Sequence, residues 1–305
     1  FFNLAGGYEY VTREVKSNVN TTKYIADGRI PTALLSEIVR QDTDEQDNLF
    51  SFNATVGYEV STAFIPYFKL SNATRTPYFN EQYGNNPANA TQIPNQNLEN
   101  EKVYGADIGA DGQIGNAYYT SALYYQRYKD YIELVNTGYK TNGTNLDIKQ
   151  FTNLDEADIY GAELMLGYKI FDDIYAQASY TYTRGKNKEN NQPLAYIAPQ
   201  KVTLSLAQKK AKGLSWKIEE ELIDNQDKIS TVNGEKETSG YELTNASISY
   251  AFGKISVFKS TTLSFELNNI FDKDYSEHLT KASSTNFYLV DETGINGAVA
   301  LQVKF

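Results

Sequence analysis

Hydrophobic and polar residues alternate strictly in many segments of this chain. In residues 50–58, Phe50, Phe52 and Val56 alternate with polar residues such as Ser51 and Asn53. A period of two places successive side chains on opposite faces of a β-strand. We therefore predict an all-β fold of about twelve strands, at residues 2–15, 48–58, 62–73, 101–110, 116–135, 157–169, 173–184, 200–209, 213–223, 241–252, 261–271 and 295–305.

The connections between these strands fall into two length classes that alternate along the chain. The short ones lie at 57–61, 111–115, 171–172, 209–212 and 253–260, and the long ones at 16–47, 74–100, 136–156, 185–199, 224–240 and 272–294. Outer-membrane barrels have short periplasmic turns and long extracellular loops. The pattern predicts an antiparallel transmembrane β-barrel whose first strand rises outward from the periplasm.

Composition agrees with a barrel and excludes other classes. The chain holds 25 Tyr and 15 Phe, its mean hydropathy is −0.51, and it has no run of eighteen apolar residues that could form a membrane helix. A barrel strand needs an apolar residue only at every second position. There is no Cys, so thiolate metal sites and disulfides are excluded, and the net charge of −10 disfavours a nucleic-acid partner.

Charged residues on the predicted strands identify the two faces. Glu163, Gln177, Lys217 and Glu266 are expected to face the lumen, where polar side chains are tolerated. Glu220 instead falls on an apolar face. A carboxylate costs less near the membrane interface than at the midplane, so we expect Glu220 close to the outer rim.

The end of the chain carries two motifs. Residues 268–275, Asn-Asn-Ile-Phe-Asp-Lys-Asp-Tyr, resemble the Asn-Leu-Phe-Asp-Lys-Asp-Tyr motif of TonB-dependent outer-membrane receptors. The terminal Phe resembles the assembly signal in the closing strand of bacterial outer-membrane barrels. The matching residues are Asn268, Asn269, Phe271, Asp272, Tyr275 and Phe305.

Further segments resemble the same family in the family's order. Residues 74–83 are similar to its Arg-Ala-Pro box, and 95–102 to its Asn-Pro-Asn-Leu box, although Gln96 and Asn100 replace the two prolines. Residues 157–163 and 180–201 resemble a barrel strand and the loop and strand that follow it. The resemblance therefore spans nearly the whole chain.

The resemblance implies a 22-stranded barrel filled by a plug domain, of which residues 1–305 are the C-terminal part of the barrel. It implies a bacterial outer-membrane location, contact with lipid and lipopolysaccharide, and energy supplied by the TonB complex through the plug, which this sequence lacks. The implied task is active uptake of a small-molecule metal chelate, with a ferric siderophore as the expected ligand. A complete twelve-stranded porin and an adhesin-like surface barrel are the alternatives.

Candidate ligand-binding residues lie in or beside the long loops. Aromatic and Arg side chains suit a planar, anionic metal chelate, through stacking and charge. The candidates for a ligand-binding rim are Arg75, Tyr78, Phe79, Tyr83, Tyr139 and His278. Each of the first five could equally belong to the interface girdle or to loop packing. His278 could touch an iron chelate or haem, or be a solvated loop residue.

Other chemistry finds little support in the residues. One His, no Cys and no Gly-x-Ser-x-Gly motif give no catalytic constellation, so we expect no enzymatic activity and no cofactor. Asp42, Asp44, Glu45 and Asp47 have the oxygen chemistry of a calcium site but lack EF-hand spacing. A solvated loop, or a divalent ion bridging this loop to lipopolysaccharide, is the other interpretation.

Overall fold

The structure is a computed structural model that describes residues 1–15, 28–35, 43–83, 91–255, 257–280 and 290–304. Among these residues, three short helical segments accompany the strands: η1 (Thr32–Leu34), α2 (Phe79–Gln82) and η2 (Thr231–Asn233). The described strands are β1 (Phe2–Val15), β2 (Thr43–Gly57), β3 (Ile65–Arg75), β4 (Gln92–Ile93), β5 (Glu101–Ile114), β6 (Ala117–Lys140), β7 (Asp147–Lys169), β8 (Ile174–Asn187), β9 (Lys201–Gln208), β10 (Gly213–Ile223), β11 (Tyr241–Ile255), β12 (Phe258–Asn268) and β13 (Asn296–Lys304).

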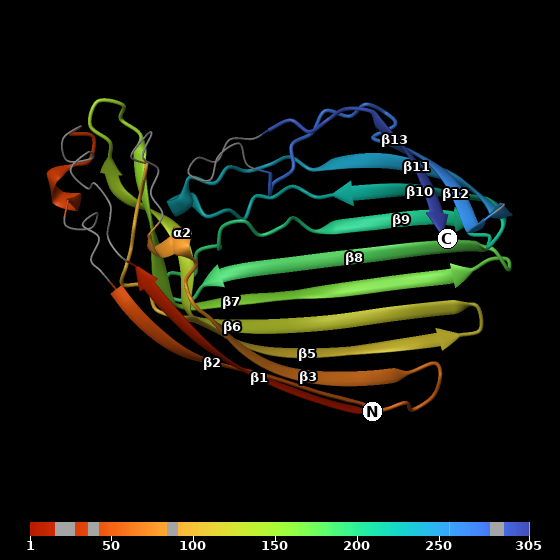
Figure 1. Ribbon diagram of the computed structural model, residues 1–305, viewed down its shortest axis with the longest axis horizontal. Helices are drawn as coiled ribbons and strands as arrows, with labels where there is room; N and C mark the ends of the chain where they lie inside the picture. Colours follow the sequence, from red (N-terminus) through yellow and green to blue (C-terminus); the bar gives the residue numbers. More distant parts are fainter. Residues whose placement is uncertain (16–27, 36–42, 84–90, 256, 281–289, 305) are drawn as a thin grey trace.

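One sheet contains all of these strands. Each long strand pairs antiparallel with its sequence neighbours from β1 to β13, whereas the two-residue β4 pairs in parallel with β7. The sheet curves into an open trough, with short turns at one end and long loops at the other (Figure 1). Within the described residues, the outer edges of β1 and β13 have no partner strand, so the sheet is not closed. The predicted all-β antiparallel fold is confirmed.

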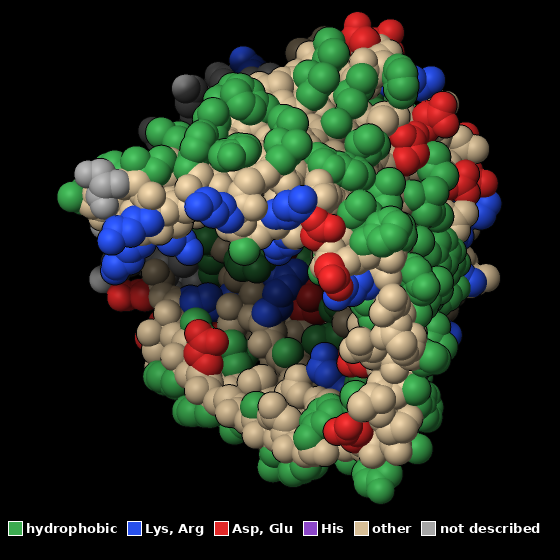
Figure 2. All heavy atoms as spheres, turned by 90° about the vertical axis from the view of Figure 1, so that its right-hand side faces the viewer, with side chains coloured by type: hydrophobic (Ala, Val, Ile, Leu, Met, Phe, Trp, Pro, Cys, Tyr) green, Lys and Arg blue, Asp and Glu red, His purple; other side chains and the backbone are tan. Residues whose placement is uncertain are grey.

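The two faces of the sheet differ in chemistry. The register pairs Leu123 with Ala162 and Tyr125 with Tyr160 on the outer face, where Leu166 and Phe265 are also exposed. Hydrophobic side chains cover the outer surface, and charged side chains line the hollow (Figure 2). An exposed apolar exterior around a polar lumen is what a lipid environment requires.

No helix in the described ranges has the length and apolar character needed to cross a bilayer.

The hairpin β6–β7 corrects the predicted strand limits. Residues 136–156 were expected to form a long loop, but β6 continues to Lys140 and β7 begins at Asp147. The β6–β7 register continues unchanged past Asp130, which has φ 56°, and shifts between Asn136 and Lys140. Residues 131–140 lie past the length of β6 that a bilayer requires, so lipid contact no longer selects alternating apolar residues there. β2 also begins earlier than predicted, at Thr43, and β4 was not predicted.

Glu220 lies three residues before the loop-side end of β10. Thr244 on β11 donates its hydroxyl to the Glu220 carboxylate over 2.5 Å. The structure thus places this carboxylate near a strand end with a polar partner, as the sequence predicted.

Candidate ligand-binding site at the loop-bearing end

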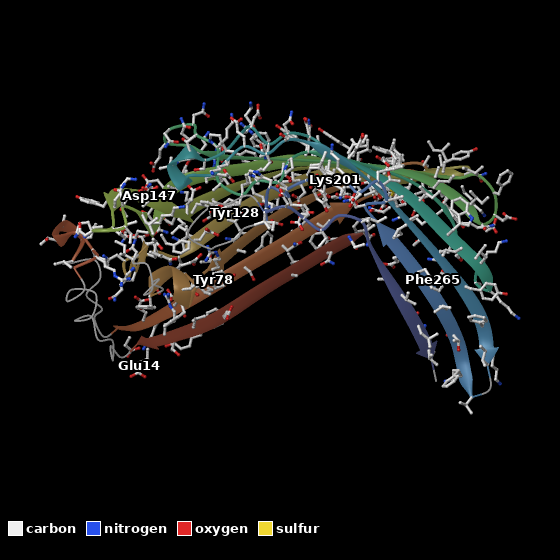
Figure 3. The ribbon with its side chains drawn as sticks, turned by 90° about the horizontal axis from the view of Figure 1, so that it is seen from above. Glu14, Tyr78, Tyr128, Asp147, Lys201 and Phe265 are labelled. Carbon is white, nitrogen blue, oxygen red and sulfur yellow. The ribbon has the colours of Figure 1, made fainter. Side chains whose placement is uncertain are left out.

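The β6–β7 hairpin extends beyond its neighbours at the loop-bearing end. A strand crosses a bilayer with about 9–11 residues, whereas β6 has 24 and β7 has 23. The part beyond Asp130 therefore projects past the bilayer. Asp147, near the hairpin tip, and Phe265, on the far arm of the sheet, lie toward opposite ends of the structure (Figure 3).

A small apolar core attaches two loops to one side of this hairpin. Ile30 and Leu34 from the β1–β2 connection pack with Ile93 from β4 and with Ile148 from β7. Ile93 and Ile148 are completely buried. The backbone amide of Lys149 also donates to the Thr91 carbonyl over 2.9 Å. Apolar burial and backbone pairing together fix these loops against the projecting hairpin.

Arg75, at the end of β3, forms the centre of an ion-pair network. Its guanidinium lies 2.8 Å from Glu81 and 3.0 Å from Glu101, two carboxylates that are about nine-tenths buried. Glu101 also accepts the Ile132 amide over 2.9 Å, which connects the network to the projecting part of β6. The same guanidinium lies 4.9 Å from the centre of the Tyr78 ring. Two carboxylates neutralise Arg75, so its main effect is to fix the loop that carries α2.

The candidate aromatic residues separate by exposure. Tyr78, Phe79 and Tyr139 are 63, 67 and 43 % exposed, whereas Tyr83 is 1 % exposed. The Phe79 and Tyr83 rings lie 5.4 Å apart, so Tyr83 supports Phe79 from within the loop. Three aromatic faces are therefore available to a ligand, two beside α2 and one near the tip of the hairpin.

His278 lies in a buried network that joins three loops. Its Nε2 lies 3.1 Å from Glu235 and its Nδ1 lies 3.1 Å from the Thr238 hydroxyl. The His278 and Glu235 side chains are each 1 % exposed. Glu235 also accepts the backbone amides of Tyr196 and Ser230, over 2.7 and 2.6 Å. A hydroxyl, an imidazole and a carboxylate in line resemble a catalytic triad, but this burial gives no substrate access.

A second apolar cluster attaches the β8–β9 loop to the other side of the hairpin. Leu194 and Ile197 pack against Ala157, and Tyr131 lies at the edge of the cluster. Glu133 on β6 accepts the Ala195 amide over 3.0 Å. Burial raises the pKa of the Glu133 carboxyl, and the nearby Glu235 charge raises it further. Burial and these carboxylates also raise the pKa of Tyr196 to about 12.

The acidic residues considered for calcium have a different role. Glu45 and Asp47 each lie 2.7 Å from the Arg13 guanidinium, and Asp47 also accepts a hydrogen bond from the side-chain Nδ2 of Asn100 over 2.6 Å. Asp42 lies outside the described residues. Within the described ranges, no group of three or more His, Cys, Asp or Glu could hold a metal ion.

The motif after β12 folds as a turn that closes the strand. Asn269 has φ 51°, accepts the Lys273 amide over 2.8 Å and donates to the Lys273 carbonyl over 2.9 Å. Asp272 accepts the Ile295 amide, which places the chain for β13. Asn268 bonds to Asn296 over 3.3 Å, and the Tyr275 ring lies 4.4 Å from Tyr241.

Phe271 and Phe305 are the remaining motif residues. Phe271 is 78 % exposed. Phe305 lies outside the described residues, and its predicted assembly role stays a prediction.

Comparison with protein families agrees with this geometry. The family model described as "TonB dependent receptor-like, beta-barrel" matches residues 1–270. The chain belongs to the TonB-dependent receptor family. No curated protein matched the sequence.

Solved structures of TonB-dependent receptors share the fold. The copper transporter OprC has a TM-score of 0.71 and 22 % identity, covering 85 % of this chain and 40 % of its own. A mutant of the ferric enterobactin receptor PfeA from Pseudomonas aeruginosa has a TM-score of 0.62 and 17 % identity over 86 % of this chain and 41 % of its own. The iron transporter FrpB from Neisseria meningitidis has a TM-score of 0.62 and 14 % identity, covering 98 % of this chain and 42 % of its own. The chain thus spans about two fifths of these proteins.

The lumen face of this TonB-dependent receptor barrel is polar, as predicted. Lys217 forms an ion pair with Glu219 beside Asn245, Ser247 and Glu266, and together they line a concavity of about 240 Å³. Tyr124 and Thr183 bond across the lumen face over 2.6 Å, directly above Gly161. No sequence pattern pointed to Asn245, which accepts the Asn269 backbone amide from the turn after β12.

Proposed function

We propose that residues 1–305 form, as one domain, the C-terminal part of the barrel of an outer-membrane receptor that imports a ferric siderophore. The observation that carries the proposal is the projecting β6–β7 hairpin, which holds packed loops and exposed aromatic rings above a polar lumen. Packed loops hold a binding surface in place before the ligand arrives, which lowers the entropic cost of binding.

The ligand contacts in this proposal are Tyr78, Phe79 and Tyr139, whose exposed rings would stack on a planar chelate. Arg75 holds the α2 loop in position, and its guanidinium lies against the Tyr78 ring. Tyr83 and His278 are buried and act as supports for the loops. In a transport receptor these residues bind and release cargo, and no catalytic step is required of them.

The partners follow from the same proposal. The receptor would lie in the bacterial outer membrane, with phospholipid and lipopolysaccharide around its apolar face. The TonB complex would supply energy through a plug domain held by lumen residues such as Glu163 and Gln177. The similar structures include transporters of copper and of iron, so the cargo must be identified by experiment.

Calorimetric titration of the purified receptor with ferric enterobactin and, separately, with copper(II) tests the cargo. Ferric enterobactin should bind, and replacing Tyr78 and Phe79 together by Ala should weaken binding by about tenfold, since each aromatic stacking contact contributes roughly 0.5–1.5 kcal/mol.

The matched control replaces Tyr58 and Phe64, two exposed aromatic residues in the short β2–β3 turn at the opposite end. This control variant should bind as tightly as the wild type. Binding of copper(II) alone would show that the siderophore assignment is wrong. Equal affinity of both double variants would show that the aromatic rim is not the binding site.

A further inference from the structure

Lysines gather at the short-turn end of the sheet, over strands β9–β13. Side chains coloured as Lys and Arg form a row along this arm when the structure is viewed from that end (Figure 2). All of these lysines are exposed. The residues are Lys209, Lys210 and Lys212 around the β9–β10 turn, Lys254 and Lys259 in the β11–β12 hairpin, and Lys304 at the end of β13.

Most of these charges have no counter-charge. Lys210 lies 3.1 Å from Asp173, whereas the other five form no ion pair with any described residue. The two hairpins are neighbours, because a Cβ atom at Gly253 would lie 3.6 Å from Lys212 Cε. Adjacent like charges repel one another, so an anionic partner outside this sheet would stabilise the arrangement.

Two lysines at the opposite end of the sheet have carboxylate partners. Lys102 lies 3.5 Å from Asp130, and Lys188 lies 3.3 Å from Asp158. Carboxylates of the chain itself therefore lie among those lysines. At the short-turn end, Asp172 pairs with Lys169 and Asp173 with Lys210, so the lysines without an ion pair are confined to the turns of β9–β13.

Exposed apolar side chains accompany the lysines. Val257 is 75 % exposed and Ile255 is 42 % exposed in the same hairpin as Lys254 and Lys259. On the outer face next to them, the exposed Tyr250 and Phe252 have ring centres 4.7 Å apart. Lysine, aromatic and aliphatic side chains coexist at a bilayer interface, where apolar parts enter the lipid and ammonium groups reach the headgroups. A soluble acidic partner would not favour exposed aliphatic turns.

We propose that the short turns of β9–β13 bind the acidic phospholipid headgroups of the periplasmic leaflet. The inference rests on the proposed outer-membrane location and on the orientation in which short turns face the periplasm. The phosphate groups would lie against the ammonium groups of Lys212, Lys254 and Lys259, while Val257 enters the apolar edge of the leaflet. This contact would fix the depth of this side of the barrel in the membrane.

The test uses the intact receptor, purified from outer membranes and placed in nanodiscs of phosphatidylcholine with increasing phosphatidylglycerol. Phosphatidylglycerol retained per receptor after extraction is measured by mass spectrometry. Replacing Lys209, Lys212, Lys254 and Lys259 together by Gln should reduce retention by about tenfold or more, because each lysine near an anionic surface strengthens attraction several-fold. Val257→Ser should reduce it by a smaller factor.

The control variant removes the same charge from the other end, through Lys102, Lys129, Lys186 and Lys188 replaced by Gln. It should retain phosphatidylglycerol as the wild type does. Equal losses in the two fourfold variants, or no loss in either, would overturn the proposal. Binding of soluble poly-glutamate would also overturn the proposal if it depends on the same lysines and is unaffected by Val257→Ser. That result would indicate a soluble acidic partner. Every variant is compared after assembly into nanodiscs. A receptor that does not insert into a membrane at all would therefore count against the proposed outer-membrane location, and not against the lipid contact.

Discussion

Arg75 lies where three parts of the loop-bearing end meet. Its guanidinium neutralises Glu81 and Glu101, and Glu101 in turn holds the Ile132 amide. Replacing Arg75 by Leu would leave two largely buried carboxylates without their cation. We expect the local stability of this network to fall by about 1–3 kcal/mol. The loss is smaller than for a fully buried pair, because the Arg75 side chain is 32 % exposed and water screens part of its charge. Hydrogen exchange at the Ile132 amide measures this loss.

Lys201→Leu is the control for that measurement. Lys201 also pairs with a carboxylate, Glu221 at 2.7 Å, but the pair joins β9 to β10 and touches neither α2 nor β6. Its removal should leave protection of the Ile132 amide unchanged. If Arg75→Leu also leaves that amide protected, the network does not stabilise the projecting strand.

The raised pKa of Glu133 makes docking of the β8–β9 loop depend on pH. Burial is the main cause of the raised pKa. The Glu133 carboxyl therefore binds a proton more readily when the β8–β9 loop is docked over it than when the loop is open, where its pKa returns toward the ordinary value near 4.5. Docking is therefore most stable below that value and weakens as pH rises through the raised pKa. Exchange protection of the Ala195 amide, corrected for the intrinsic rate at each pH, should fall over this interval.

Glu133→Gln removes the titrating group and keeps an oxygen that can accept the Ala195 amide. Its exchange protection should show no such decline with pH. A decline of the same size in this variant would show that the pH dependence does not come from Glu133.

The roles of single loop residues were the least predictable part of the sequence. The exposed rings of Tyr78 and Phe79 agree with a rim position, whereas Tyr83 in the same segment is buried. His278 is buried because Glu235 and Thr238 come from another loop about forty residues away in the chain. No periodic pattern in the sequence specifies such contacts between loops.

Close packing on the lumen face is a property of the strands β6, β7 and β8 as a group. Any Cβ atom at Gly161 would clash with the Tyr124 side chain and with the Tyr182 carbonyl oxygen. Gly161→Val should therefore displace Tyr124, break its bond to Thr183 and destabilise the barrel by about 1–3 kcal/mol. The temperature at which the folded receptor changes mobility in gel electrophoresis should fall. Gly6→Ala should leave it unchanged, because its nearest neighbour would be 3.8 Å away.

Strand positions were largely predictable, and the errors have identifiable causes. Alternation located each of the twelve long strands, because each has one face toward lipid and the other toward the lumen. It failed beyond Asp130 in β6, where the bilayer no longer selects apolar residues on one face. The register of β6 with β7 also shifts there, between Asn136 and Lys140. β4 has two residues, too few to show any period.

At the scale of the whole molecule, the sheet's two free edges determine what residues 1–305 can do alone. The described edges of β1 and β13 present unpaired backbone groups, and each such group costs several kcal/mol in hydrocarbon. The sequence predicted these edges, because the family barrel has more strands than this chain supplies. They also argue against the self-contained twelve-stranded porin, which would pair its first strand with its last.

We therefore predict that residues 1–305, produced without further barrel strands, will aggregate in detergent or close into a narrower and less stable barrel. Closure would bring β1 against β13 and increase the curvature of the whole sheet. The increased curvature would disturb contacts between neighbouring strands, such as the hydrogen bond between Tyr124 and Thr183. Folding into detergent micelles followed by electrophoresis without heating measures the outcome. The intact receptor, treated in parallel, should migrate as a compact monomer. A heat-modifiable monomer of residues 1–305 with equal thermal stability would show that the twelve long strands are sufficient for a barrel.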